Sequence, residues 1–276
     1  GNGLRDGDRD GTEAGTVAGQ RASYERDFEV DMAISFGEKA RFRVNGFTTR
    51  LGASAVFRTI PSEVPTMEQL ELPPVLRRFA ELEKGIVIVT GPTGSGKSTT
   101  LASMINHINT HMSKHVLTIE DPVEFFHTSK KSLINHRELG RDTHSFKNAL
   151  KSALREDPDI IMVGEIRDLE TAEISIKAAQ TGHLVLSTLH TNSAPETLTR
   201  LMNMGVPSYN IASSVSLIIA QRLARRLCPA CKEPETLPDE EMLKLGFTSE
   251  QISKLQLFKA VGCDKCTEGY KGRVGI

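Results

Sequence analysis

Eight consecutive residues, 91–98, combine glycine, lysine and serine at the spacing of a phosphate-binding loop. They read Gly-Pro-Thr-Gly-Ser-Gly-Lys-Ser, a full G-x-x-x-x-G-K-[ST] pattern. Glycines let the backbone turn tightly, so that successive N–H groups face phosphate oxygens. Lys97 is expected to reach the β- and γ-phosphates of ATP, and Ser98 to offer its hydroxyl to Mg²⁺. The predicted nucleotide-binding residues are Gly91, Pro92, Thr93, Gly94, Ser95, Gly96, Lys97, Ser98 and Thr99.

Acidic residues follow two apolar runs, where a nucleotide hydrolase would need them. Glu120, Asp121 and Glu124 come after the run 116–119, and Glu165 closely follows a second such run. The carboxyl ends of parallel strands are where such sheets place ligands. Hydrolysis needs one acid near Mg²⁺ and one that polarises the attacking water. For any single carboxylate, a solvated loop charge or a helix cap is the alternative.

Two histidines flank the last apolar run of the central region, residues 184–189. His183 precedes this run and His190 follows it. A hydrogen-bonded structural histidine is the ordinary interpretation of either residue. His190 lies at the far end of the predicted strand, and its other possible role is to sense the γ-phosphate.

The four cysteines form two Cys-x-x-Cys pairs, Cys228 with Cys231 and Cys263 with Cys266. In a chain with cytosolic enzyme chemistry, paired spacing favours a metal site over disulfides. Four sulfur ligands favour Zn²⁺ in a closed structural site, with iron as the less favoured metal. Four reduced cysteines without a metal are the alternative.

Composition limits the classes of protein that fit. The 276 residues suffice for one large domain or two modest ones, and the formal net charge is −1. Without a basic excess, we predict no nucleic-acid partner. The longest apolar candidate, residues 215–227, is interrupted by Gln221 and three arginines. It is therefore too polar for the roughly 18–20 residues of a membrane span, and no secretory signal peptide is recognised.

From residue 85 onward, apolar runs alternate with amphipathic stretches. That order predicts an α/β fold with a parallel sheet flanked by helices. The predicted strands are residues 86–89, 116–119, 160–163 and 184–186. The predicted helices are residues 97–108, 146–155, 169–181, 194–202 and 209–226, with a short one at 239–245.

The N-terminal part has a different pattern. Residues 1–20 are rich in Gly and Asp, and we expect them to be a disordered lead or a cloning or assembly remnant. Short strands are predicted at 28–36, 40–47 and 55–60, with a turn at Asn45-Gly46. Four prolines then mark a linker over 61–84, with a short helix near 67–70.

Together these motifs resemble the secretion ATPase superfamily, the motors of type IV pili and type II secretion systems. The resemblance covers roughly residues 24–276. Its pieces are the Walker A loop at 91–98, the Asp box at 118–124, an atypical Walker B at 157–168 and a His box from 182 to 191.

The resemblance implies a RecA-like ATPase domain after a PAS-like domain, assembled as a homo-hexamer. It implies hydrolysis of ATP to ADP and phosphate, with Glu124 as catalytic base and Glu165 supporting Mg²⁺ and the water. It implies that arginines of the N-terminal unit, here Arg41, Arg43 and Arg58, meet nucleotide across a subunit interface. A surface-strand arginine is the alternative for each. The implied location is cytoplasmic, peripheral at the inner membrane, with a membrane platform protein as partner.

The predicted organisation is a lead (1–20), partial PAS-like strands (21–60), a linker (61–84), a RecA-like core (85–227) and a zinc-binding element (228–276). Residues up to about 155 resemble pilus retraction ATPases, whereas those from 165 resemble assembly and type II secretion ATPases, whose relatives carry such cysteines. We therefore predict a motor of pilus or pseudopilus assembly. The alternatives are a retraction ATPase, a non-hydrolysing nucleotide-binding fragment and, more weakly, a nucleic-acid motor.

Overall fold

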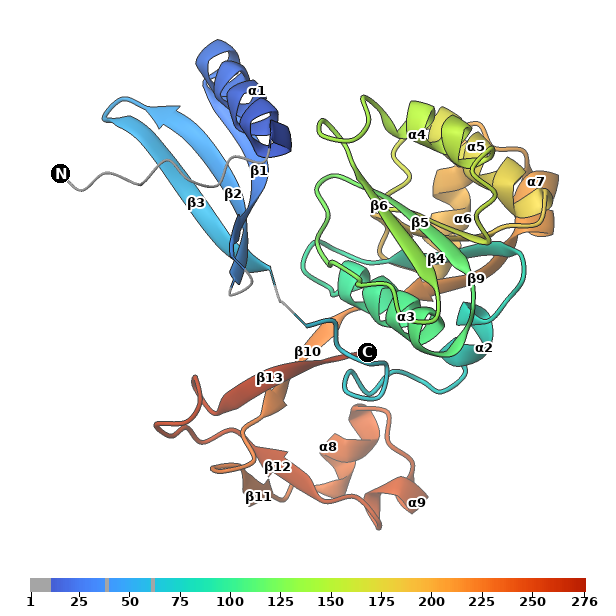
Figure 1. The fold of residues 1–276 in the computed structure, drawn as a ribbon. Coiled ribbons are helices and arrows are strands. Elements are labelled where there is room, and N and C mark those ends of the chain that lie inside the picture. The colour runs from blue at the N-terminus through green and yellow to red at the C-terminus, as the bar shows by residue number, and fades with distance from the viewer. Residues whose placement is uncertain (1–10, 38–39, 61–62) are drawn as a thin grey trace. The chain divides into compact units, whose positions relative to one another are not determined.

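The computed structural model describes residues 11–37, 40–60 and 63–276 (Figure 1). The chain divides into two compact units. The first runs to Ala220 apart from Gly94–Gly96, and the second comprises Gly94–Gly96 with Gln221–Ile276.

A six-stranded sheet, in the order β6-β5-β7-β8-β4-β9, forms the centre of the first unit. All its pairings are parallel, which confirms the predicted α/β class and the four predicted strands. The strands are β4 (Gly85–Thr90), β5 (His115–Glu120), β6 (Leu133–Glu138), β7 (Ile160–Val163), β8 (Leu184–Leu189) and β9 (Val215–Ala220).

Both faces of this sheet are buried, which explains why its central strands are mostly apolar instead of alternating between apolar and polar residues. In β4, Ile86 and Ile88 pack in one hydrophobic cluster, whereas Val87 and Val89 pack in another. The first cluster includes the buried faces of α4 and α5, and the second includes that of α3. Alternate side chains of a strand point to opposite faces, so each strand contributes to both cores.

Three helices of this unit begin at residues whose side chains cap them. Side chains of Ser145, Asp168 and Ser193 accept backbone N–H bonds at the starts of α4, α5 and α6. The helices are α2 (Leu76–Ala80), α3 (Lys97–His111), α4 (Phe146–Ala153), α5 (Leu169–Gln180), α6 (Ala194–Asn203) and α7 (Ser208–Ser214).

Two predictions for this region are wrong. The helix predicted at 67–70 is a turn, and the first helix of this stretch is α2. The helix predicted at 209–226 is helical only in α7 and continues as β9 and β10 (Leu223–Leu227). The apolar run that starts at Val215 pairs in parallel with β4, and this sheet burial outweighs helix propensity. The first compact unit ends at Ala220.

The N-terminal part is an antiparallel meander of β1 (Glu29–Phe36), β2 (Ala40–Thr49) and β3 (Gly52–Ile60), as predicted. The turn predicted at Asn45-Gly46 is wrong, because both residues continue β2 and the chain turns at Arg50 and Leu51. Gly46 lies opposite Val30, and a Cβ at this position would meet the Val30 Cγ1 at 3.1 Å. Here the glycine permits close strand packing instead of a turn.

Helix α1 (Gly11–Asp27) precedes this meander. The second half of the lead predicted as disordered is therefore helical, while residues 1–10 lie outside the described residues. Ala, Glu, Gln and Arg in this segment have good helix propensity, and Arg21 pairs with Glu25 one turn later at 2.8 Å.

The second unit contains two small antiparallel ribbons, β10 with β13 (Tyr270–Gly275) and β11 (Glu233–Glu235) with β12 (Leu257–Lys259). Its helices are α8 (Asp239–Lys244), as predicted, and α9 (Ser249–Ile252). In the part of the chain that the structure describes, no helix is long and apolar enough to cross a membrane.

Candidate functional site

The glycine-rich loop connects the end of β4 to the start of α3, the context that phosphate binding requires. Gly91, Gly94 and Gly96 have φ angles of 146°, 80° and 86°. Residues with a Cβ rarely adopt this region, so the loop conformation depends on these three positions being glycine. Helix α3 begins at Lys97, which places its N-terminal N–H groups at the end of the loop.

Lys97 is held against its own loop. Its Nζ donates to the carbonyl oxygens of Gly91 at 2.9 Å and Pro92 at 3.1 Å. The residue is only 8% exposed. Burial lowers the pKa of the Lys97 amine, and the negative charge of Glu124 acts in the opposite direction. The predicted base and the loop lysine are thus close enough to influence each other.

The loop that carries Glu124 follows β5 and is held by two buried carboxylates. Glu138, at the end of β6, accepts the Val123 N–H at 3.0 Å. Glu120, at the end of β5, accepts the Glu124 N–H at 3.3 Å. The Glu124 side chain itself is 44% exposed. Its backbone is therefore fixed while its carboxylate faces solvent.

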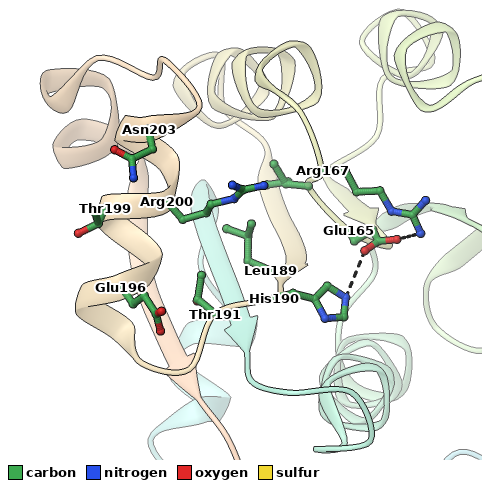
Figure 2. A pocket seen from close by; sticks show the side chains of 10 residues that line it. Glu165, Arg167, Leu189, His190, Thr191, Glu196, Thr199, Arg200 and Asn203 are labelled. Atoms are coloured by element: carbon green, nitrogen blue, oxygen red, sulfur yellow. Dashed lines mark ion pairs between the residues drawn. The ribbon is translucent and has the colours of Figure 1, made fainter.

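Glu165 and His190 lie together beyond the ends of β7 and β8 (Figure 2). The His190 Nε2 lies 3.2 Å from one oxygen of Glu165, and Arg167 pairs with the other. Burial, reinforced by the charges of Lys97 and Arg167, lowers the pKa of His190. The ring is therefore neutral at pH 7, and it can donate or accept a hydrogen bond without carrying charge.

A pocket of about 450 Å³ adjoins this pair. Figure 2 shows Glu165, Arg167 and His190 together and side chains of α6, including Thr199, Arg200 and Asn203, at another part of the lining. Next to His190, the Thr191 hydroxyl bonds to the Thr90 hydroxyl at 2.6 Å. That bond fixes the end of β8 beside the end of β4, directly before the phosphate loop.

The other predicted residues have mixed surroundings. His183 fits the ordinary interpretation of a hydrogen-bonded structural histidine. Its Nδ1 lies 2.9 Å from the Ala178 carbonyl oxygen, near the end of α5. In β2, Arg41 lies 3.8 Å from Glu138, and Arg43 pairs with Asp31 at 2.6 Å. Arg43 also lies 4.0 Å from Glu124. Arg58 lies opposite Arg43 on β3.

The four cysteine sulfurs converge, each within 4.8 Å of the others. Cys228 and Cys263 are 4.0 Å apart, and Cys231 and Cys266 are 3.7 Å apart. With Zn–S bonds of about 2.3 Å, a tetrahedral site has sulfurs about 3.8 Å apart. The donor set and its spacing therefore fit one tetrahedral ion.

Two functional candidates were not predicted from the sequence. Glu138 ends a polar edge strand that was not recognised, and Gln221 was noted only as an interruption in an apolar run. Gln221 is 7% exposed and donates to the Ser95 carbonyl at 2.7 Å. The available sequence signal was a glutamine between two short runs that can form strands, residues 215–220 and 223–227.

Comparison with known proteins agrees with the motifs. The family model for the Type II/IV secretion system protein matches residues 21–276. The type IV pilus assembly ATPase PilB of Acinetobacter baylyi is 51% identical over 243 residues, which are 85% of this chain and 41% of that protein. The type IV pilus retractation ATPase PilT of Pseudomonas aeruginosa is 53% identical over 194 residues, 68% of this chain and 56% of that protein.

A solved structure of the pilus retraction motor PilT with bound ADP is also similar. Its TM-score is 0.73 with 42% identity, over 79% of this chain and 67% of that one. This chain spans about half the length of the two curated relatives. The resemblance inferred from the motifs is confirmed, and the chain belongs to the Type II/IV secretion system protein family of pilus and secretion motor ATPases.

Proposed function

We propose that this chain hydrolyses ATP to ADP and phosphate and powers assembly of a type IV pilus or of a type II secretion pseudopilus. One observation carries the hydrolytic part. The Thr90–Thr191 hydroxyl bond of 2.6 Å holds the strand end before Lys97 beside the strand end before His190, and β5, which precedes Glu124, ends at the same edge of this parallel sheet. A phosphate-binding cation, an exposed carboxylate and a neutral histidine at one sheet edge support attack of water on a terminal phosphate.

Each group has a proposed role in a RecA-like site. N–H groups of the loop and of the α3 N-terminus bind the β- and γ-phosphates, and Lys97 neutralises their charge. Ser98 and Glu165 are oxygen donors of the kind that Mg²⁺ takes, and the bound ion would supply charge stabilisation at the phosphates. Glu124 accepts the proton of the attacking water, and His190, which contacts Glu165 through its Nε2, senses the γ-phosphate through Glu165.

The assembly state follows from family resemblance. We propose a homo-hexamer in the cytoplasm, peripheral to the inner membrane at a platform protein. Arg41, Arg43 and Arg58, from a PAS-like unit, would complete the nucleotide site of a neighbouring subunit. In the described chain, Asp31 holds Arg43, so this arginine would exchange a carboxylate for phosphate on assembly.

Two observations favour assembly over retraction as the direction of the motor. The assembly ATPase match extends over 85% of this chain, whereas the retraction ATPase match extends over 68%. The converging cysteines support the same choice, and we propose that they bind one structural Zn²⁺. Retraction is the second candidate, supported by the likeness to the solved retraction motor.

ATP turnover measured together with molecular mass tests this proposal. If arginines act in trans, specific activity rises with protein concentration as the chain assembles. A constant specific activity in a monomeric sample would exclude shared sites for this chain. A hexamer that binds Mg·ATP without any turnover would instead support the non-hydrolysing alternative.

A further inference from the structure

The side-chain amide of Gln221 contacts the phosphate loop. This residue directly follows β9 and belongs, with Gly94–Gly96, to the second unit. Its Nε2 donates to the Ser95 carbonyl at 2.7 Å, and the bond is buried. A Cβ placed on Gly96 would lie 2.9 Å from the same nitrogen. A Cβ at position 96 would therefore displace the Gln221 amide, and the φ angle of 86° favours glycine independently.

The bond to Ser95 has a consequence for the next N–H group. In a trans peptide, the C=O of one residue and the N–H of the next point in opposite directions. The described chain has a cis peptide only at Asp121-Pro122, so the Ser95–Gly96 bond is trans. By fixing the Ser95 oxygen toward itself, Gln221 fixes the Gly96 N–H away from itself. Phosphate loops bind phosphate oxygens with such N–H groups.

Gln221 is itself held in place. Arg222 and Ile276 exchange two backbone hydrogen bonds, each 2.9 Å long. A Cβ on Gly275 would lie 3.8 Å from the Cδ and Nε2 of Gln221, so the end of β13 packs against this side chain. The Gln221 amide is therefore confined between the backbone at Gly275 and the Ser95 carbonyl.

We propose that Gln221 is a positioning residue for phosphate binding. It holds the Ser95–Gly96 peptide in the orientation that presents the Gly96 N–H to the nucleotide phosphates. This inference rests on the proposed nucleotide site and assigns it a residue far outside the 91–98 motif. Gln221, just before β10, and Gly94–Gly96 belong to the same unit as the cysteines.

Gln221→Met tests the idea, because it keeps most of the side-chain length and removes the donor. We expect this variant to bind Mg·ADP about tenfold more weakly, the effect of losing one buried hydrogen bond and the order that it maintains. The matched control is Gln251→Met, which alters an exposed glutamine of α9 in the same unit. Its Mg·ADP affinity is expected to stay within about twofold of wild type.

A second readout separates positioning from general stability. In ¹⁵N-labelled protein, Mg·ADP should shift the Gly96 amide resonance strongly in wild type and only weakly in Gln221→Met. If that variant unfolds, Gln221→Asn provides the comparison, since its amide is one methylene too short to reach Ser95.

The outcomes distinguish this inference from the proposed function. Wild-type affinity and an unchanged Gly96 shift in Gln221→Met, with binding lost in Lys97→Ala, would overturn only the role of Gln221. A wild-type chain that binds no Mg·ADP would overturn the nucleotide site and this inference together. The inference is supported if Gln221→Met binds Mg·ADP more weakly and shows a smaller Gly96 shift, while Gln251→Met shows neither change.

Discussion

Replacing Glu138 by alanine is expected to slow ATP hydrolysis while nucleotide binding is kept. Glu138 is 9% exposed and accepts the Val123 N–H at 3.0 Å. Val123 directly precedes Glu124, the proposed base. The carboxylate of Glu138 therefore acts on Glu124 through the backbone of this loop, and it also lies 3.8 Å from Arg41.

The expected loss of rate follows from the Val123 N–H group, which Glu138→Ala leaves without an acceptor. An unpaired buried N–H costs about 1–3 kcal/mol. In Glu138→Ala, the loop avoids this cost by moving until the Val123 N–H is hydrogen-bonded to water. That movement displaces Glu124 from its position in the site. A free energy of about 1.4–2.8 kcal/mol corresponds to a roughly ten- to hundredfold loss of rate. We therefore expect kcat to fall by about ten- to hundredfold in Glu138→Ala, and less in Glu138→Gln, which keeps an acceptor oxygen.

Steady-state turnover at saturating ATP, with Mg·ADP affinity measured by titration, is the assay. Glu156→Ala is a suitable control, because it removes a partly exposed carboxylate. The Glu156 carboxylate pairs at 3.2 Å with Arg137, which precedes Glu138 on β6. Such a surface pair contributes about 0–1 kcal/mol, so its kcat should hardly change.

The decisive comparison is a double variant. If Glu138 acts through Glu124, then Glu138→Ala should add little to Glu124→Gln, because the positioned group has already lost its function. An equal fold-loss in both backgrounds would refute the reasoning, as would an unchanged kcat in the single variant.

Four further outcomes are expected. Lys97→Ala should lose both Mg·ADP affinity and turnover, and wild-type values in either titration or assay would remove the phosphate-loop assignment. Glu124→Gln should lower kcat by roughly a hundredfold or more with ATP still bound, and equal turnover would move the base to Glu165. Elemental analysis should find one Zn²⁺ per chain, which Cys263→Ser should release; four freely titrating thiols in folded protein would contradict the site. Burial lowers the pKa of His127 to about 4. Since the unfolded chain then binds the proton more readily, stability should be lost as pH falls from about 6.5 to 4, by about 3 kcal/mol. Chemical denaturation should show a shallower pH slope in His127→Gln.

The sequence predicted those features whose signal is local. The residue types and spacing of the loop at 91–98 indicate phosphate binding directly, and the four central strands are mostly apolar because helices cover both sheet faces. Strand β6 escaped recognition because an edge strand can be polar, as Asn135, His136 and Arg137 make it. The helix predicted over 209–226 failed because the partner of β9 is β4, more than a hundred residues earlier. Gln221 directly follows β9 and owes its position to the same long-range pairing, whereas Glu138 ends β6, whose partner β5 is the preceding strand.

The edge of the N-terminal meander affects how the isolated chain should be handled. Strand β3 pairs with β2 on one side, and no other described strand pairs with it. Val56 is 49% and Phe57 58% exposed on this strand. An open edge with exposed apolar side chains is a template for edge-to-edge aggregation. Light scattering of a concentrated sample should therefore detect non-specific association as well as ring formation, and Phe57→Lys is the substitution that should suppress the former while ATP turnover per folded chain persists.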